Sequence, residues 1–272
     1  MHLIDGAKVR GSWNNNTYQI MSKLGEGNFG QVFLVENNGK KHALKLSKHV
    51  VSITKEYRML LQLNKDKGLK NLKALPDVVD TDDCTMVDDL YRFIVLEYFD
   101  GNVLSSLLER KILLEEKELV EIGISLGRVI SCLHQRQLAL GDLKPANLFY
   151  EKDKPLKIVD LGGVTPFGAE VEEYTPMFDR ATWQMGTRIA EPSYDIFACC
   201  ILLTLLATGN RLLDLDGGKE NLLELVAKLT WTKGTKQTII NGLLGRYEDV
   251  GTFIGRLEKN KLLKISRNHG FH

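Results

Sequence analysis

Apolar and polar positions alternate in short runs along the first third of the chain. The runs at 18–24, 31–36 and 41–46 are rich in apolar residues, and Gly-Asn and Asn-Gly pairs stand between them. This pattern is typical of strands joined by hairpin turns. Two more strand candidates follow, the second of which ends in the apolar run 93–98. The first third is therefore predicted to form an antiparallel sheet.

A helical spacing first occurs at 52–63. Apolar or aromatic side chains stand at Ile53, Tyr57, Leu60 and Leu61, which places them on one face of a helix. Ser52 is the predicted N-cap. This single helix is expected to belong to the strand-rich part of the chain.

Helical patterns dominate the rest of the chain. The segments 103–114 and 118–135 have helical periodicity, and the apolar run 196–207 predicts a buried core helix. Two short strand-like pieces, 146–150 and 157–159, bracket a turn. We expect an α+β fold with two lobes, in which the first is an antiparallel sheet plus one helix and the second is mainly helical.

The link between the two lobes is predicted near Asp100–Gly101. The expected organisation is an N-terminal extension at 1–16, a domain at 17–258 with lobes 17–98 and 102–258, and a basic tail at 259–272.

Composition and charge set further limits. The 272 residues are 43% hydrophobic and 26% charged, with a formal net charge of +1, which is ordinary for a globular protein and gives no general argument for a nucleic-acid partner. In the tail, Lys259, Lys261, Lys264 and Arg267 are a weak signal for nucleic acid.

The amino terminus lacks the apolar run of a signal peptide, no segment is long enough to span a membrane, and the cysteines form no C-x-x-C motif. We therefore expect a cytoplasmic protein.

Residues 24–35 read LGEGNFGQVFLV and contain Gly25, Gly27 and Gly30 in a G-x-G-x-x-G-x-V pattern. Glycines let a hairpin lie close over phosphates, so that backbone N–H groups can face them. A strand rather than a helix is predicted to follow. The pattern therefore argues against a dinucleotide-binding fold and favours a loop that covers nucleotide phosphates.

Lys45 stands in the next predicted strand, in the stretch HALKLS. A lysine that points inward is costly to bury unpaired, although its long stem can also carry the ammonium to solvent. Glu56 on the predicted helix is the expected partner. A lysine held in this way is suited to bind the α and β phosphates of a nucleotide.

Residues 140–149 read LGDLKPANLF. Asp142 and Asn147 are five residues apart, the spacing of an aspartate that accepts a substrate hydroxyl proton and an asparagine that binds Mg²⁺. Lys144 is placed to steady the γ-phosphate. By itself, such a stretch is also compatible with an ordinary turn rich in Gly, Asp, Pro and Asn.

The stretch KIVDLGG at 157–163 places Asp160 at the end of a short apolar strand. An aspartate at this point is a candidate second ligand for Mg²⁺. Four such motifs, in this order and on these predicted elements, are hard to explain by chance.

Over roughly residues 17–258, these motifs resemble the eukaryotic-type (Hanks-type) serine/threonine protein kinases. The stretches WNNNTY, EYTPMFDR and EPSYDIFA are most similar to the YabT-like kinases of spore-forming bacilli. The resemblance implies a serine/threonine protein kinase that acts in sporulation and uses ATP with Mg²⁺, or Mn²⁺ as an alternative. It also implies protein substrates with Ser or Thr acceptors and self-association during autophosphorylation.

Further roles are implied by the same resemblance. Leu96 corresponds to the gatekeeper, and Asp195 to the aspartate that holds the backbone of the catalytic loop. Thr165 and Thr175 are candidate autophosphorylation sites, and Thr175 also corresponds to a structural threonine of the substrate-binding loop. The residues expected to bind ATP are Leu24, Gly25, Gly27, Gly30, Val32, Ala43, Lys45, Glu56, Leu96, Glu97, Phe99 and Phe149.

The chain departs from the family pattern at three places. Gly141 replaces an arginine that meets a phosphate on the activation loop and couples loop order to catalysis. We therefore predict activity that does not depend on phosphorylation of that loop. Leu140 replaces a histidine, and we expect it to stack with Leu161 and Leu60. The glutamate of the A-P-E motif has no clear counterpart, and the candidates to replace it are Asp179 and Glu191.

Two other functions remain open. Small-molecule kinases of the aminoglycoside and choline type share the fold and often have glycine before the catalytic aspartate, whereas the three-glycine loop, Lys144–Pro145 and Thr175–Pro176 favour a protein kinase. A pseudokinase that acts only as a scaffold predicts damage at the metal-binding or proton-handling positions. The residues at those positions are all present: Lys45, Asp142, Asn147 and Asp160.

Overall fold

The computed structural model describes residues 5–27, 30–86, 89–152, 154–213 and 218–268, and for 210, 213 and 262–268 it describes the backbone alone. The chain divides into two compact units, Met1–Asp100 and Gly101–His272. We call them the N-terminal unit and the C-terminal unit.

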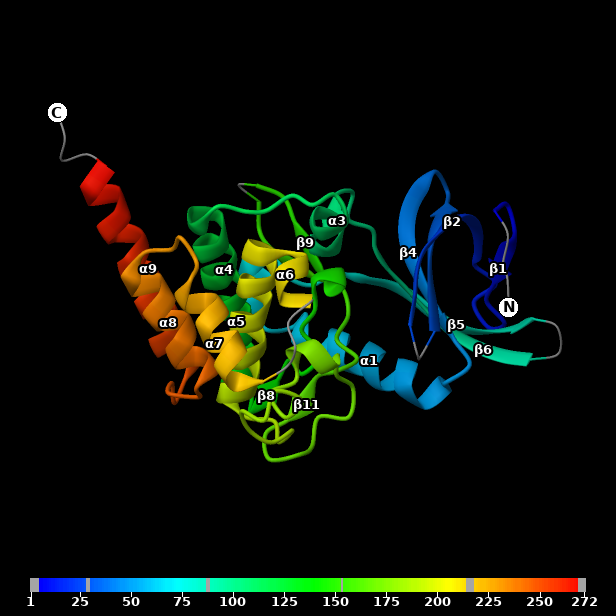
Figure 1. The fold of residues 1–272 in the computed structure, drawn as a ribbon. Coiled ribbons are helices and arrows are strands. Elements are labelled where there is room, and N and C mark those ends of the chain that lie inside the picture. The colour runs from blue at the N-terminus through cyan, green and yellow to red at the C-terminus, as the bar shows by residue number, and fades with distance from the viewer. Residues whose placement is uncertain (1–4, 28–29, 87–88, 153, 214–217, 269–272) are drawn as a thin grey trace. The chain divides into compact units, whose positions relative to one another are not determined.

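The N-terminal unit is built on a six-stranded antiparallel sheet with the order β1-β2-β3-β4-β6-β5 (Figure 1). Its strands are β1 (Lys8–Arg10), β2 (Thr17–Gly27), β3 (Gly30–Asn37), β4 (Lys40–Ser47), β5 (Val78–Met86) and β6 (Asp89–Glu97). Successive side chains of a strand point to opposite faces. Phe33, Val35, Leu44 and Phe93 are fully buried on one face and form the centre of the core of this unit.

The segment after β1 connects the two edge strands of this sheet. Asp82 on β5 accepts hydrogen bonds from the backbone N–H groups of Trp13 (3.0 Å) and Asn14 (2.8 Å). Asp80 accepts a bond of 2.7 Å from the hydroxyl of Tyr18, and burial together with this carboxylate raises the pKa of Tyr18. The N–H of Ser12 also donates to the Asp83 carbonyl (2.8 Å), which covers one backbone group of this edge strand. The segment predicted as an extension is therefore partly built into the sheet.

Two helices follow β4, namely α1 (Val50–Leu63) and the short α2 (Lys67–Leu72). The helix predicted at 52–63 is present, but Ser52 is not its N-cap, because α1 begins two residues earlier and His49 occupies the cap position. The hydroxyl of Ser47 accepts a hydrogen bond from the N–H of His49 and so fixes the entry to the helix. The buried face of α1 packs against β5 and β6.

The C-terminal unit is mainly helical. Its helices are α3 (Leu104–Glu109), α4 (Glu116–His134), α5 (Pro192–Thr208), α6 (Asn210–Leu213), α7 (Lys219–Ala227), α8 (Lys233–Leu243) and α9 (Val250–Asn268). The central helix α5 is apolar on all sides and is buried among α4, α8 and α9, as a helix without a polar face must be. A capping box between Glu115 and Glu118 begins α4.

Short strands of the C-terminal unit position the loops between α4 and α5. The strands β7 (Asn102–Val103), β9 (Leu148–Tyr150) and β10 (Lys157–Ile158) form one small sheet, and β8 (Leu138–Ala139) pairs with β11 (Thr165–Pro166). The predicted fold class, an antiparallel sheet in the first part and mainly helices in the second, is confirmed.

Two predicted elements of this unit are shorter in the structure. The strand expected at 146–150 loses its first residues, because Pro145–Asn147 forms a 3-10 turn in which the N–H of Asn147 donates to the Lys144 carbonyl (3.0 Å). The helix expected over 103–114 ends with α3, and Lys111 just beyond it adopts a left-handed φ of 57°. That conformation cannot continue a helix.

The helix α9 extends into the segment predicted as a basic tail. It continues through 259–268, but the side chains of Lys264 and Arg267 lie outside the described residues, as do 269–272 altogether. In the part of the chain that the structure describes, no helix is both long enough and apolar enough to cross a membrane.

Candidate active site

The glycine-rich motif lies on the hairpin of β2 and β3. Gly27 pairs with Gly30 and Gly25 with Val32. Gly30 has a φ of +155°, and a Cβ there would lie 2.3 Å from the Leu46 carbonyl oxygen, so only glycine fits. A Cβ at Gly25 or Gly27 would meet none of the described atoms within 4 Å. The backbone of this hairpin is therefore open to a ligand at two of its three glycines.

Lys45 and Glu56 form a buried ion pair in the N-terminal unit. The distance from Lys45 Nζ to Glu56 Oε2 is 2.6 Å, and the side chains are 13% and 4% exposed. β4 carries Lys45 between Val32 of β3 and Ile94 of β6, and Glu56 stands on the buried face of α1. The pairing expected from the sequence is present. A buried lysine paired in this way has a fixed position from which to bind a phosphate.

The residues expected around adenine line up on neighbouring strands. Ala43 on β4 pairs with Leu96 on β6, and His42 pairs with Glu97. Leu96 is buried, and Phe99 just after β6 is 8% exposed. The N–H of Glu97 donates to the Asp77 carbonyl (2.9 Å). Phe149, which is also expected to bind ATP, lies on β9 of the C-terminal unit.

The Asp142 carboxylate is held by two side chains of the C-terminal unit. Lys144 Nζ lies 2.5 Å from Asp142 Oδ2, and the hydroxyl of Thr175 donates a hydrogen bond of 2.8 Å to Asp142 Oδ1. The amide of Asn147 donates to the Asp142 backbone carbonyl at 3.3 Å. The structure thus brings together four predicted site residues: Asp142, Lys144, Asn147 and Thr175.

Asp195, in the first turn of α5, holds the backbone in front of Asp142. Its carboxylate accepts hydrogen bonds from the N–H groups of Leu140 (2.8 Å) and Gly141 (3.1 Å), and it lies 2.9 Å from His134 Nε2. Asp195 is fully buried. A buried carboxylate with three partners fixes the catalytic loop far more firmly than a solvent-exposed contact could.

Asp160 and Asn147 provide a donor set suited to Mg²⁺. Asp160 Oδ1 accepts a hydrogen bond of 2.9 Å from the N–H of Gly162. The Asn147 amide nitrogen donates to the Asp142 carbonyl, which fixes the orientation of the amide group. Among the described residues, no group of three or more His, Cys, Asp or Glu side chains could hold a metal. In sites where a metal bridges nucleotide phosphates, Mg²⁺ usually takes one or two protein oxygen ligands and completes its shell with phosphate oxygens and water.

The activation segment, residues 163–175, is held by backbone hydrogen bonds. β11 pairs with β8, and Val171 N–H donates to the Arg188 carbonyl (2.8 Å). Ala190 exchanges bonds with this segment, accepting from Gly168 (2.9 Å) and donating to Ala169 (2.8 Å). Val171 also belongs to a buried apolar cluster with Ala139, Ala190 and Tyr194.

Thr165 lies on β11 and is buried, with 8% of its surface exposed. Its hydroxyl donates to the Gly163 carbonyl (2.9 Å). Phosphorylation at this position would require the hydroxyl to leave this bond and become exposed.

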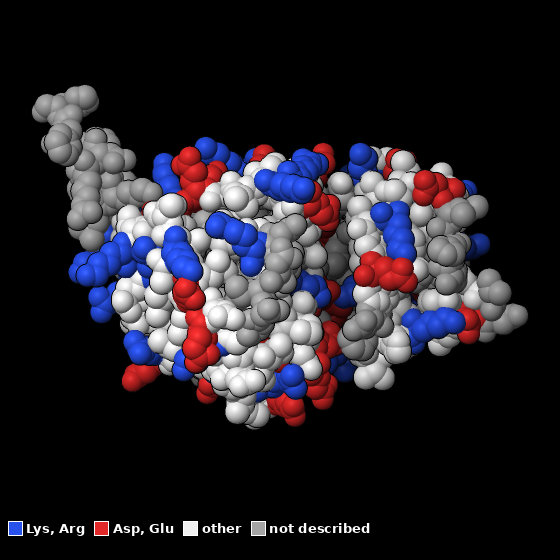
Figure 2. Space-filling view, viewed as in Figure 1, with Lys and Arg blue, Asp and Glu red and all other residues white. Residues whose placement is uncertain are grey.

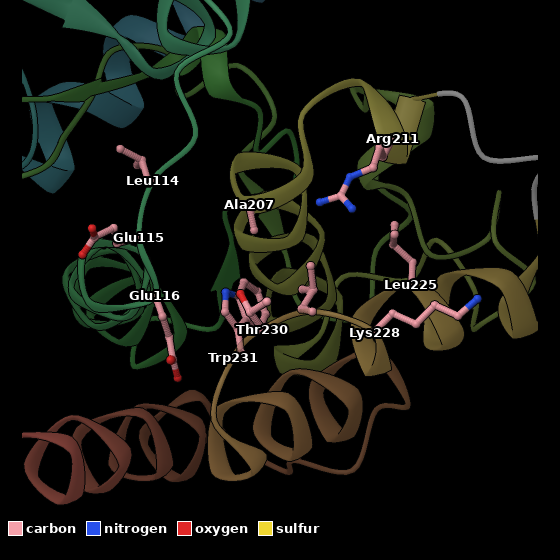
Figure 3. A pocket seen from close by; sticks show the side chains of 10 residues that line it. Leu114, Glu115, Glu116, Ala207, Arg211, Leu225, Lys228, Thr230 and Trp231 are labelled. Atoms are coloured by element: carbon pink, nitrogen blue, oxygen red, sulfur yellow. The ribbon is translucent and has the colours of Figure 1, made fainter. Parts of the chain in front are cut away.

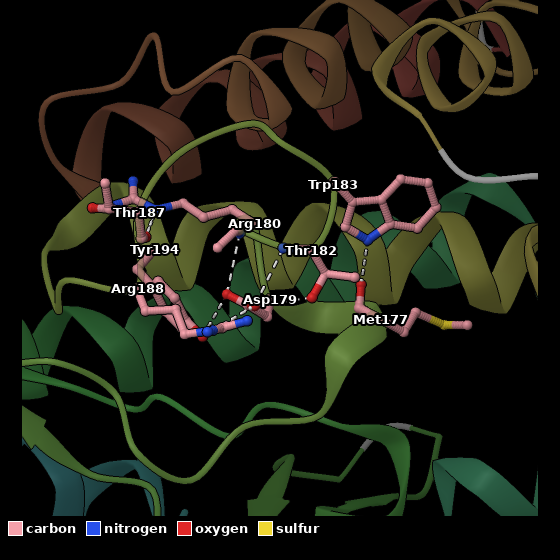
Figure 4. Close-up of polar contacts among 9 residues, drawn as sticks. Met177, Asp179, Arg180, Thr182, Trp183, Thr187, Arg188 and Tyr194 are labelled. Atoms are coloured by element: carbon pink, nitrogen blue, oxygen red, sulfur yellow. Dashed lines mark hydrogen bonds and ion pairs between the residues drawn. The ribbon is translucent and has the colours of Figure 1, made fainter.

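The Asp179 carboxylate joins several side chains of the segment after Thr175, which the sequence predicts to be the substrate-binding loop (Figure 4). Its carboxylate is fully buried and accepts from the Arg188 guanidinium (2.9 Å), the Thr182 hydroxyl (3.0 Å) and the Tyr194 hydroxyl (3.4 Å). The Arg188 guanidinium also lies over the Tyr174 ring, 4.2 Å from its centroid. The hydrogen bond from Arg188 to Asp179 raises the pKa of the guanidinium.

Arg180 binds the other side of this loop. Its guanidinium donates to the Thr187 carbonyl (2.6 Å) and the Ser193 hydroxyl (2.5 Å) and pairs with Glu191 (2.7 Å). Both carboxylates considered as replacements for the A-P-E glutamate therefore pair with an arginine. The roles of Arg180 and Arg188 were not predicted from the sequence. Their closeness in the sequence to Asp179, Glu191 and Gly186 could have indicated them.

A hollow of about 410 Å³ lies elsewhere in the C-terminal unit (Figure 3). Its walls include Leu114 before α4, Glu116 at the start of α4, Arg211 in α6 and Trp231 before α8. None of the predicted site residues lines it, so the hollow is separate from the chemistry proposed for the catalytic loop.

Positive and negative side chains are interspersed on the face shown in Figure 2, as the net charge of +1 suggests. The thiols of Cys84, Cys199 and Cys200 are buried, and burial raises the pKa of Cys84 to about 11 and that of Cys199 to about 12. These cysteines are therefore packing residues rather than reactive groups.

The fold and the catalytic loop together define a protein kinase. The family model of the protein kinase domain matches residues 18–242, so the chain belongs to this family. It is 32% identical over 246 residues to the serine/threonine-protein kinase YabT of Bacillus subtilis (strain 168), a match that covers 89% of this chain and 71% of YabT. The relationship to YabT places the chain among the serine/threonine protein kinases.

Two further comparisons also find protein kinases. A probable serine/threonine-protein kinase of Clostridium perfringens (strain 13 / Type A), CPE1738, is 24% identical over 273 residues, covering 90% of this chain but 38% of its own length. The solved structure of vaccinia related kinase 3 covers 98% of this chain and 93% of its own, with a TM-score of 0.73 and 18% identity. The latter comparison supports the fold alone.

Proposed function

We propose that this chain transfers the γ-phosphate of ATP to serine or threonine hydroxyls of proteins and that it does so without a phosphate on its activation loop. The observation that carries the proposal is the carboxylate of Asp142, which Lys144 and Thr175 hold at 2.5 and 2.8 Å. A carboxylate fixed from both sides is suited to orient a hydroxyl for attack.

Each residue of the catalytic loop has a distinct role in this proposal. Asp142 accepts the proton of the substrate hydroxyl, and Lys144 steadies the transferring phosphoryl group. Asn147 and Asp160 hold Mg²⁺, which neutralises charge on the phosphates when it is bound. Positioning and charge neutralisation supply most of the catalysis, because phosphoryl transfer has a loose transition state.

Nucleotide binding is assigned mainly to the N-terminal unit. Gly25, Gly27 and Gly30 cover the phosphates, and Lys45, held by Glu56 at 2.6 Å, binds them. The residues of this unit proposed to surround adenine are Leu24, Val32, Ala43, Leu96, Glu97 and Phe99.

Independence from loop phosphorylation is supported by the way the activation segment is held. Gly141 has no side chain that could meet a phosphate, and the bonds that hold Val171 and Ala190 are between backbone groups, which need no modification. The same bonds are already made in the unmodified chain. A phosphate is therefore not required to order this segment.

Transfer of radiolabelled γ-phosphate from Mg²⁺-ATP tests the proposal. Wild type and Asp142→Asn would be compared on generic protein acceptors and on an aminoglycoside panel. We expect label on serine or threonine of the proteins, lost in the variant. Label on the small molecules alone would instead favour a small-molecule kinase, and thermal stabilisation by Mg²⁺-ATP without any transfer would favour a scaffold.

A further inference from the structure

Gly141 and Gly163 bring two backbone segments of the C-terminal unit into direct contact. Gly141 has a φ of +78°, and a Cβ there would lie 2.1 Å from the Gly163 carbonyl oxygen. In the opposite direction, a Cβ at Gly163 would lie 2.6 Å from the backbone nitrogen of Asp142 and 2.7 Å from its Cβ. Real Cβ atoms do not approach backbone atoms this closely, so neither position can carry a side chain without a shift of the chain.

The backbone around Asp142 is therefore fixed from two directions. On one side, the buried carboxylate of Asp195 accepts from the N–H groups of Leu140 and Gly141 at 2.8 and 3.1 Å. On the other side lies Gly163, whose carbonyl accepts from the Thr165 hydroxyl at 2.9 Å. Because Asp195 is fully buried and holds three partners, a displaced Gly163 contact is expected to shift the catalytic loop or the activation segment.

We infer that Gly141 and Gly163 are positioning residues, which set the place of Asp142 relative to the segment that follows Asp160. The inference rests on the proposed function and deepens it. Glycine at 141 is then a requirement of the site rather than only the loss of an arginine. The contact provides a permanent backbone link between catalytic loop and activation segment, where other family members use an arginine and a phosphate.

Because of this contact, restoring the arginine at position 141 is not expected to restore regulation by phosphorylation. Grafting Arg at position 141 would add a Cβ that collides with Gly163 and would place a long side chain on a left-handed backbone. We expect Gly141→Arg to be inactive and phosphorylation of the loop not to rescue it.

The decisive comparison uses three alanine variants. Gly141→Ala and Gly163→Ala each introduce the collision, and Gly168→Ala is the matched control, because Gly168 lies on the same segment with a φ of +85° but a Cβ there would meet nothing within 4 Å. Initial rates would be measured on phosphatase-treated proteins over a range of ATP and protein-acceptor concentrations, with melting curves for each variant.

We expect kcat to fall about 100-fold or more in Gly141→Ala and Gly163→Ala, since a misplacement of about 1 Å can have this effect. KM for ATP should stay within a few-fold, because the ATP-binding residues are assigned to other segments. Gly168→Ala should melt at a lower temperature but keep kcat within about threefold, because its cost is backbone strain alone.

Gly141→Asn separates the effect of backbone strain from the effect of the steric collision. Asparagine tolerates positive φ, so a loss as large as that of alanine indicates collision.

A further variant covers the case in which both collision variants fail to fold. Thr165→Val removes the hydroxyl that holds the Gly163 carbonyl but adds nothing to the contact. We expect a smaller fall in kcat at unchanged KM for ATP, and recovery in Thr165→Ser.

The inference would be overturned if Gly141→Ala and Gly163→Ala fold and keep the kcat of wild type. If neither of them folds, an unchanged kcat in Thr165→Val would overturn it. An inactive wild type would count against the proposed function itself.

Discussion

The hydroxyl of Thr175 donates a hydrogen bond of 2.8 Å to Oδ1 of Asp142. Thr175 directly precedes the 3-10 turn at Pro176–Phe178 that begins the substrate-binding loop. The bond therefore ties the loop proposed to receive the substrate to the carboxylate proposed to orient its hydroxyl. Lys144 holds the other oxygen of the same carboxylate.

Thr175→Val removes this bond at nearly constant volume. We expect kcat to fall by about 10- to 100-fold, because a loosely held carboxylate is less often in the productive orientation. KM for ATP should change little. Thr175→Ser is the control, since it keeps the hydroxyl. Steady-state kinetics on a protein acceptor checks this, and equal rates for the valine variant and wild type would show that the bond has no catalytic role.

Lys45→Met breaks a buried ion pair and leaves Glu56 without the cation that it faces at 2.6 Å. Removal of one partner of such a pair destabilises a protein by about 3–5 kcal/mol, whereas replacement of both by apolar residues is often nearly neutral. We therefore expect Lys45→Met to melt well below wild type and the double variant Lys45→Met/Glu56→Leu to recover most of the stability. Neither should show the thermal shift that Mg²⁺-ATP gives to wild type. A double variant that still binds Mg²⁺-ATP as wild type does would remove Lys45 from the nucleotide site.

Arg188→Met leaves the buried carboxylate of Asp179 without its guanidinium partner and removes the cation over the Tyr174 ring. We expect lower thermal stability and a higher KM for the protein acceptor, because Asp179 organises the substrate-binding loop, while KM for ATP is unchanged. Arg188→Lys keeps a charge but not the planar geometry, so its thermal stability and its KM for the protein acceptor should lie between those of wild type and Arg188→Met. An effect on KM for ATP with none on the acceptor would contradict this role.

Glu191 links pH to stability. The pKa of its carboxyl is lowered first by the hydrogen bond from the Ser193 hydroxyl and further by the Arg180 guanidinium, against burial, which raises it. A pKa that is lowered by folding contributes stability above the unfolded value, near 4.5, and this contribution disappears as the pH falls through the folded value. Wild type should therefore melt above Glu191→Gln at pH 7 and 6, and the difference should shrink below about pH 4.5.

Melting curves of both proteins at several pH values check this expectation. Asp82 and Asp249 also have lowered pKa values, but they are present in both proteins and cancel in the difference. A difference that grows as the pH falls would contradict the assignment.

The sequence predicted some neighbouring pairs of the candidate site but not the contacts that support them. Motif spacing was sufficient to pair Lys45 with Glu56 and to group Asp142 with Asn147, because local structure largely fixes these neighbours. The contact between Gly141 and Gly163 joins segments that meet only in the folded chain. In the sequence this contact is visible only as two glycines. Gly141 stands where the family has an arginine, and Gly163 follows the predicted metal-binding motif. Without the structure, Gly141 could be interpreted simply as the loss of that arginine.

Element boundaries were the weaker part of the prediction. Ser52 was a reasonable N-cap by residue type, but α1 begins at Val50, and the hydroxyl of Ser47 instead accepts a hydrogen bond from the N–H at the cap position. Propensity is a weak prior in such places, and packing overrides it. The role of Asp80 and Asp82 in joining the edges of the sheet could not be anticipated either, since it depends on a turn at 11–16 that returns to β5.

The central claim is transfer of phosphate to protein hydroxyls without prior phosphorylation of the activation segment. The most direct measurement is the progress curve of radiolabelled phosphate transfer by protein that has been treated with phosphatase and shown by mass spectrometry to be unmodified. Asp142→Asn serves as the inactive control. We expect label on serine or threonine from the first time point, with no lag and no gain after preincubation with ATP. A lag that preincubation abolishes, together with phosphate on Thr165 or Thr175, would contradict the account.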